Sequence, residues 1–120
     1  MQPNIEENDK LSYLGDVMLP EPITKARWLT DSSIIAATTH GNMYRLQLQR
    51  DDQNAWCLKK PTKIYSSEHE VAIWDLAVYS SGQTQDVWLC EDSGKVLHLS
   101  FDEKLDVKDV TLVYVSKNLL

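Results

Sequence analysis

The sequence is poor in several residue types, and each shortage excludes a class of protein. Only 2 of its 120 residues are cysteines, which is too few for a disulfide framework. Only 4 are glycines, and none has the spacing of a P-loop or of a dinucleotide-binding turn. No apolar run approaches the roughly 20 residues that span a bilayer, and the polar, acidic residues 1–9 do not form a signal peptide. The sequence therefore predicts a protein of the cytoplasm, the nucleus or both, with no membrane partner.

Basic residues are also scarce. The chain has 12 lysines and arginines against 18 aspartates and glutamates, and its formal net charge is −6. Because nucleic-acid binding depends mainly on the neutralisation of phosphates by lysine and arginine, no direct binding to nucleic acid is expected. The densest basic group, Lys59, Lys60 and Lys63, is interpreted as a solvated edge strand. An acidic surface instead favours basic protein partners such as arginine-rich tails.

No group of residues has the arrangement that catalysis or metal binding requires. The three histidines, His40, His69 and His98, lie far apart in the sequence, so no metal site is expected. The chain has no Gly-x-Ser-x-Gly motif, and neither Cys57 nor Cys90 has an evident catalytic partner. A pair of acids for glycosidic chemistry is compatible with the composition, but nothing singles one out. We therefore expect no catalytic residues, no cofactor and no enzymatic activity, with a small enzyme as a distant alternative.

What the sequence does contain is a repeated pattern of short strands and tight turns. In the second half, an apolar strand follows His69, Ser80-Ser81-Gly82 turns the chain, and a second strand runs from Asp86 to Cys90. Asp92-Ser93-Gly94 forms the next turn, and a third strand runs from Lys95 to Phe101. Three strands in this order form a β-meander.

The same order occurs earlier in the chain, from Ile23 to Leu48, so the meander is present twice. The apolar run Ile34–Ala37 falls on Val87–Cys90, and Gly41 falls on Gly94. The second copy has a longer first turn, which leaves the strand pairing intact. Ile23, Ala26, Trp28, Met43 and Leu46 correspond in the same way to Ile73, Leu76, Val78, Val96 and Leu99.

A fourth strand follows each copy. Trp56–Lys60 and Lys63–Tyr65 indicate an outer strand broken by Pro61, which lacks the N–H group that a central strand donates. Val110–Val115, rich in β-branched and aromatic residues, indicates the outer strand of the second copy. The sequence therefore predicts an all-β fold of about two four-stranded antiparallel sheets, with little helix.

This pattern resembles the WD40-repeat β-propeller family over roughly residues 20–115. His69 matches the histidine of the family's Gly-His pair, and Asp92-Ser93-Gly94 matches its Asp-x-Gly turn. Leu46-Gln47 and Leu99-Ser100 depart from the family, because Trp-Asp would stand there. The resemblance implies two degenerate propeller blades. It also implies that His69 and Asp92 form a buried hydrogen-bonded pair with a structural role.

The expected organisation is a flexible acidic leader at residues 1–10 and a propeller segment at 11–120. Blade one spans about 21–67 and blade two about 68–116. Because a closed propeller needs roughly 4–8 blades, two blades leave the ring incomplete and its edges open. We therefore expect a fragment or short isoform of a longer propeller, or a member of a hetero-oligomeric complex. Alone, the chain is expected to be marginally stable or to self-associate.

Two residues are predicted to contact partners. Trp74 lies at the start of a strand, where a propeller blade meets the face that binds partners, and large aromatic residues are frequent interaction hot spots. Burial of Trp74 between the blades is the alternative. Glu91, just before the turn at Asp92, is the weaker candidate.

Within the family, residues 23–48, with Glu68-His69 and Ser80-Ser81-Gly82, are similar to methylosome-type WD-repeat adaptors. This resemblance implies a non-catalytic scaffold that supports a symmetric protein arginine methyltransferase and presents basic, arginine-rich substrates. A second likeness, through Trp74-Asp75-Leu76 and Cys90–Gly94, is to WD-repeat scaffold subunits of the nuclear pore. Both imply a protein that binds other proteins within a larger assembly.

Overall fold

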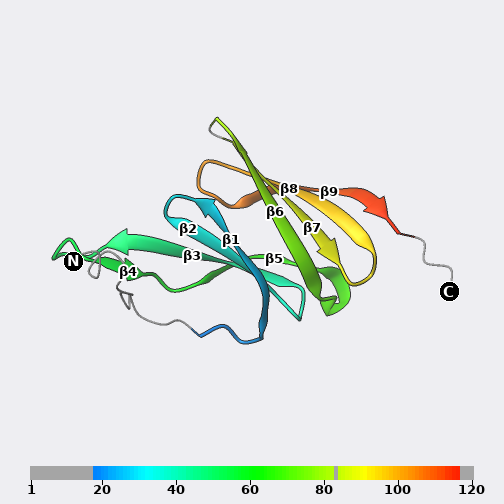
Figure 1. The fold of residues 1–120 in the computed structure, drawn as a ribbon, viewed down its shortest axis with the longest axis horizontal. Helices are drawn as coiled ribbons and strands as arrows, with labels where there is room; N and C mark the ends of the chain where they lie inside the picture. Colours follow the sequence, from blue (N-terminus) through cyan, green and yellow to red (C-terminus); the bar gives the residue numbers. More distant parts are fainter. Residues whose placement is uncertain (1–17, 83, 117–120) are drawn as a thin grey trace, which may run out of the picture.

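The computed structural model describes residues 18–82 and 84–116, which form two antiparallel β-sheets (Figure 1). The predicted all-β fold is confirmed, since the helix found in these two ranges is limited to the short 3-10 turn η1 at Glu68–Glu70. The expected leader at residues 1–10 lies outside the described residues.

The first sheet is built by the first repeat. Its strands are β1 (Ile23–Thr30), β2 (Ser33–Thr38), β3 (Asn42–Arg50), β4 (Trp56–Leu58) and β5 (Thr62–Ser66). β1, β2 and β3 pair in that order, and both β4 and β5 pair with β3, so these two form one broken outer strand. The break includes Pro61, as predicted, because proline cannot donate a hydrogen bond to the sheet, but it begins two residues earlier than expected, at Lys59.

The second sheet is built by the second repeat. Its strands, β6 (Ile73–Ser81), β7 (Thr84–Glu91), β8 (Lys95–Phe101) and β9 (Val107–Val115), pair in chain order. β9 is the edge strand that the β-branched run predicts, and most of its residues are exposed. The predicted sheet of four strands is therefore observed without a break.

One hydrophobic core lies between the two sheets. β1 and β6 lie next to each other, and the hydroxyl of Thr24 donates a hydrogen bond to the carbonyl oxygen of Ile73. Farther out, Arg45 of β3 donates to the carbonyl oxygen of Leu105, in the turn between β8 and β9. Leu29, Ile35, Ala37 and Met43 enter the core from the first sheet, and Ile73, Leu76, Val87, Leu89, Leu97, Leu99 and Phe101 enter it from the second.

Alternation of side chains along the strands divides each sheet into two faces. In the first sheet one face packs on the second sheet, and we call it the front face. The front face of the first sheet carries Ile35, Ala37, Met43 and Arg45.

The repeat assigns an equivalent front face to the second sheet, and this face lies on the side away from the core. It carries Trp88, Cys90, Val96 and His98. The second sheet enters the core with its opposite, back face, which carries Val87, Leu89, Leu97 and Leu99. The two sheets therefore pack front to back, through faces that are not equivalent.

Candidate functional site

The hydrogen bond expected between His69 and Asp92 is replaced by a different one. His69 lies in η1 with φ of 61°, and its side chain is exposed. The Oδ1 atom of Asp92 accepts a hydrogen bond from Nε1 of Trp74 at 2.7 Å. Trp74 lies at an irregularity in the pairing of β6 with β7, between Ile73 and Asp75, and irregularities of this kind redirect side chains. The pair implied by the family resemblance is thus corrected to Trp74 and Asp92.

The two predicted contact residues differ in exposure. Trp74 is 53% exposed, so it is accessible, and its contact with a partner stays a prediction. Glu91 is only 7% exposed, and its Oε2 atom accepts a hydrogen bond from the hydroxyl of Tyr65 at 3.0 Å. Its Oε1 atom accepts another from the hydroxyl of Ser93 at 3.2 Å. Glu91 therefore joins β7 to β5 of the first sheet.

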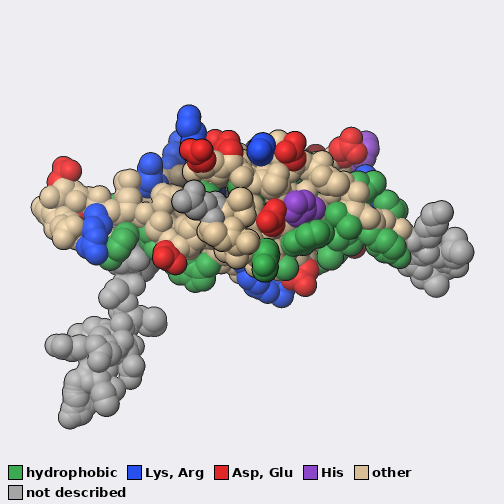
Figure 2. Space-filling model, turned by 90° about the horizontal axis from the view of Figure 1, so that it is seen from above, with side chains coloured by type: hydrophobic (Ala, Val, Ile, Leu, Met, Phe, Trp, Pro, Cys, Tyr) green, Lys and Arg blue, Asp and Glu red, His purple; other side chains and the backbone are tan. Residues whose placement is uncertain are grey.

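The front face of the second sheet is an exposed apolar surface that sequence reasoning missed. Trp88 is 41% exposed and Cys90 is also exposed. The ring of Trp88 contacts that of His98 at 4.5 Å between centroids, and His98 Nε2 lies 2.8 Å from Asp86 Oδ1. Figure 2 shows hydrophobic side chains gathered toward the C-terminal end of the molecule, with histidine and acidic side chains beside them. No signal in the sequence marked this face, because Trp88 aligns with Ile35, which is buried.

A carboxylate site lies where the chain enters the first sheet. Glu21 Oε1 accepts hydrogen bonds from Asn42 Nδ2 at 2.6 Å, Thr38 Oγ1 at 3.0 Å and the Tyr44 hydroxyl at 3.3 Å. Desolvation raises the pKa of Glu21, but these hydrogen bonds and the nearby His40 outweigh it and lower the pKa below its ordinary value. Burial, followed by the charge of Glu21, raises the pKa of Tyr44. The site therefore holds an ionised Glu21 against a protonated tyrosine.

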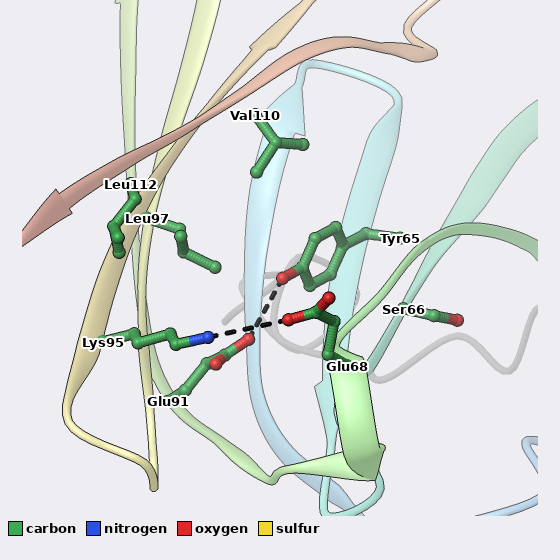
Figure 3. Close-up of a pocket in the computed structure, with 8 residues that line it drawn as sticks. All are labelled: Tyr65, Ser66, Glu68, Glu91, Lys95, Leu97, Val110 and Leu112. Carbon is green, nitrogen blue, oxygen red and sulfur yellow. Dashed lines mark hydrogen bonds and ion pairs between the residues drawn. The ribbon is translucent and has the colours of Figure 1, made fainter. Parts of the chain in front are cut away.

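An open groove of about 450 Å³ lies between β5 and the outer strands of the second sheet (Figure 3). Tyr65 and Glu68 line one side, and Glu91 and Lys95 line the other, with Lys95 Nζ 3.8 Å from Glu68 Oε1. Burial, followed by the negative charge of Glu91, raises the pKa of Tyr65, which keeps its hydroxyl protonated as a donor. Leu97, Val110 and Leu112 form the apolar part of the lining.

The described residues contain no group of three or more histidine, cysteine, aspartate or glutamate side chains placed to hold a metal ion. In the same ranges, no helix has the length and apolar character needed to cross a membrane. The chain matches no protein-family model, no curated protein and no solved structure. The contacts and faces described above are therefore the basis for a functional interpretation.

Proposed function

We propose that this chain is a non-catalytic adaptor of WD40-propeller type, whose two sheets act as successive blades and whose exposed front face binds a protein partner. The supporting observation is the front-to-back packing of the two sheets. Two sheets related by a two-fold axis would bury the same face of each sheet. In a head-to-tail arrangement, the front face of one sheet packs on the back face of the next, so one front face and one back face stay uncovered at the two ends. Successive propeller blades are related in the head-to-tail way, with their first strands innermost and adjacent. The neighbouring positions of β1 and β6, the first strands of the two sheets, support this proposal.

The front face of the second sheet has the chemistry of a docking surface, because the equivalent face of the first sheet is already covered by another sheet. Ile35 is 0% exposed under the second sheet, whereas Trp88 at the equivalent position is 41% exposed. Arg45 holds the turn at Leu105 and Asp106, and His98 stands at the same position on the uncovered face. A partner that presents an aliphatic sheet to Trp88 would repeat the internal contact.

The charge of the chain supports a basic partner. The net charge is −6, and the strand registers place Asp75, Asp86 and Asp109 around the front face of the second sheet. Acidic rims attract basic proteins and suppress acidic ones. This fits an adaptor that supports a protein arginine methyltransferase and presents arginine-rich substrates. A structural subunit of the nuclear pore is the second candidate, which the same uncovered face supports equally.

The test is affinity capture from cell extract with the whole chain and three tryptophan variants. Trp88→Ala is expected to reduce recovery of the partner by about tenfold or more, since truncated hot-spot residues cost about 2 kcal/mol or more. Trp74→Ala tests the contact predicted from sequence. Trp56→Ala is the matched control, because Trp56 is similarly exposed, at 45%, but lies on β4 of the first sheet.

Recovery of an arginine methyltransferase that depends on Trp88 supports the adaptor. Recovery of pore subunits with the same dependence favours the scaffold alternative. Equal losses with Trp56→Ala and Trp88→Ala would contradict a docking role for the front face.

A further inference from the structure

Three residues that line the groove of Figure 3 correspond, in the repeat, to the three residues of the first sheet that bind Glu21. In the first sheet, three side chains at the end of β2 and the start of β3 donate hydrogen bonds to that carboxylate, and they are Thr38, Asn42 and Tyr44. The repeat makes them equivalent to Glu91, Lys95 and Leu97 of the second sheet. All three of these residues line the groove.

The substitutions reverse the polarity of the site. Thr38 donates to a carboxylate, whereas Glu91 at the equivalent position is itself a carboxylate and accepts hydrogen bonds from Tyr65 and Ser93. Glu91 is 7% exposed, and no cation of the described residues lies within ion-pair distance of it. Because a buried charge is costly unless an opposite charge compensates it, the site is complementary to a cation.

The lining of the groove also specifies the shape of that cation. In Figure 3, the carboxylates of Glu91 and Glu68 converge with the ammonium group of Lys95, and Val110 and Leu112 lie farther along the groove. Val110 is 49% exposed and Leu112 is 53% exposed, so this apolar wall is open to a ligand. A side chain with a long methylene stem and a charged head matches both parts.

We propose that this groove binds an arginine side chain from an extended segment of a basic partner protein. The guanidinium group would donate to Glu91 and Glu68, and its methylene stem would lie against Leu97 and Leu112. Arginine suits the site better than lysine, because its head is more weakly hydrated and its donors form a fixed fork that reaches two acceptors. Lys95 then acts as the internal competitor for Glu68, because it neutralises that carboxylate when no partner is bound.

This proposal extends the adaptor function by giving arginine-rich partners a site of their own, but it does not depend on the front face. The groove lies on the back face of the second sheet, and Trp88 lies on the front. Trp88→Ala is therefore expected to leave arginine binding within about twofold of the wild type, since surface substitutions away from a site have small effects.

The experiment measures the fluorescence anisotropy of a labelled peptide with one arginine in a threonine- and valine-rich sequence, titrated with the whole chain. The matched probe carries citrulline, which keeps the shape of arginine without its charge. The arginine peptide is expected to bind about tenfold or more tightly than the citrulline peptide, since hydrogen bonds between charged groups contribute more than neutral ones. Equal binding of the two peptides, or no binding of either, would overturn the proposal.

Two pairs of variants locate the binding in the groove. Glu91→Gln keeps an acceptor for Tyr65 but removes the charge, and about a tenfold loss is expected, whereas Glu103→Gln removes the same charge from the exposed turn after β8 and should have little effect. Lys95→Met removes the competing cation, so it should tighten binding several-fold more than Lys104→Met does.

The second pair is a gain of affinity, so it stays informative even if Glu91→Gln does not fold. If both variants of each pair change the affinity for the arginine peptide equally, the affinity depends only on the net charge of the chain. That result would contradict binding in the groove.

Discussion

Ile35 and Trp88 occupy equivalent positions in the two repeats, but one is 0% exposed and the other 41%. The strands that carry them have the same register toward the next strand, since Ile35 pairs with Arg45 and Trp88 with His98. Only the neighbour differs, because the first sheet has the second packed on its front face. The comparison shows that the same element is core in one sheet and surface in the other.

The two repeats differ in a second way, at the end of their second strands. The first sheet closes this site with its own Glu21, whose carboxylate is held by three donors. In the second sheet the equivalent residue is Glu91, which accepts a hydrogen bond from Tyr65 of the first sheet and lines an open groove. One site is satisfied from within its own repeat, and the other joins the two sheets.

The largest expected effect is on the free energy of unfolding, and it compares the buried Ile35 with the exposed Trp88. Ile35→Ala should lower the free energy of unfolding by about 2–5 kcal/mol, because it leaves a cavity in the core between the sheets. Trp88→Ala should cost less, because its side chain is already 41% exposed; the contact with the His98 ring contributes about 0.5–1.5 kcal/mol beyond the area that is buried. Urea denaturation of both variants measures the difference, and equal losses would show that the front face of the second sheet is covered in solution.

The next effect separates the two equivalent turn glycines. Gly41 and Gly94 have φ of 79° and 89°, so alanine at either should cost about 1–2 kcal/mol for the left-handed conformation. At Gly41 the new Cβ would lie 2.1 Å from Ser67 Oγ and 2.3 Å from the Val71 carbonyl oxygen. At Gly94 its nearest neighbours lie at 3.2 Å.

Gly41→Ala should therefore be more destabilising than Gly94→Ala by about 1–3 kcal/mol, the usual cost of overpacking. Thermal unfolding of the two variants under one buffer condition makes the comparison. Similar melting temperatures would mean that the segment after β5 moves away from the turn, and the contact between the repeats would then be looser than described.

The smallest effect concerns acid pH. The pKa of Glu21 is lowered on folding, so its contribution to stability is present above the ordinary glutamate pKa of about 4.3 and is lost as the pH falls through the lowered value. Glu21→Gln should therefore lose less stability than the wild type on acidification. Chemical denaturation at several pH values checks this, with Glu103→Gln, an exposed glutamate, as the control that should follow the wild type.

The sequence was sufficient to predict the strands because each carries its own signal. A continuous apolar run marked β2, alternation marked β3, and turn residues bounded β7 and β8. Pro61 marked the break in the outer strand, and β-branched residues marked β9. The candidate sites were not predictable in the same way. Trp74 is predicted to contact a partner, with burial between the blades as the alternative; it is 53% exposed, and its contact with a partner stays a prediction. Its hydrogen bond to Asp92, at an irregularity of strand pairing, was not predicted. Glu91 is the weaker of the two predicted contact residues, but the fold buries it against Tyr65.

By itself the sequence determined the secondary structure, the repeat and the acidic charge, because these follow from local side-chain preferences and from composition. Tertiary structure alone decided which face of each sheet is buried. It also decided that the Glu21 carboxylate is bound by donors of its own repeat, whereas the Glu91 carboxylate borders a groove between the sheets. Those outcomes depend on how one sheet is placed on the other, and the packing of Ile35 under the second sheet leaves no trace in the residues around Trp88. Burial is a property of the pair of sheets, whereas propensity is a property of each strand.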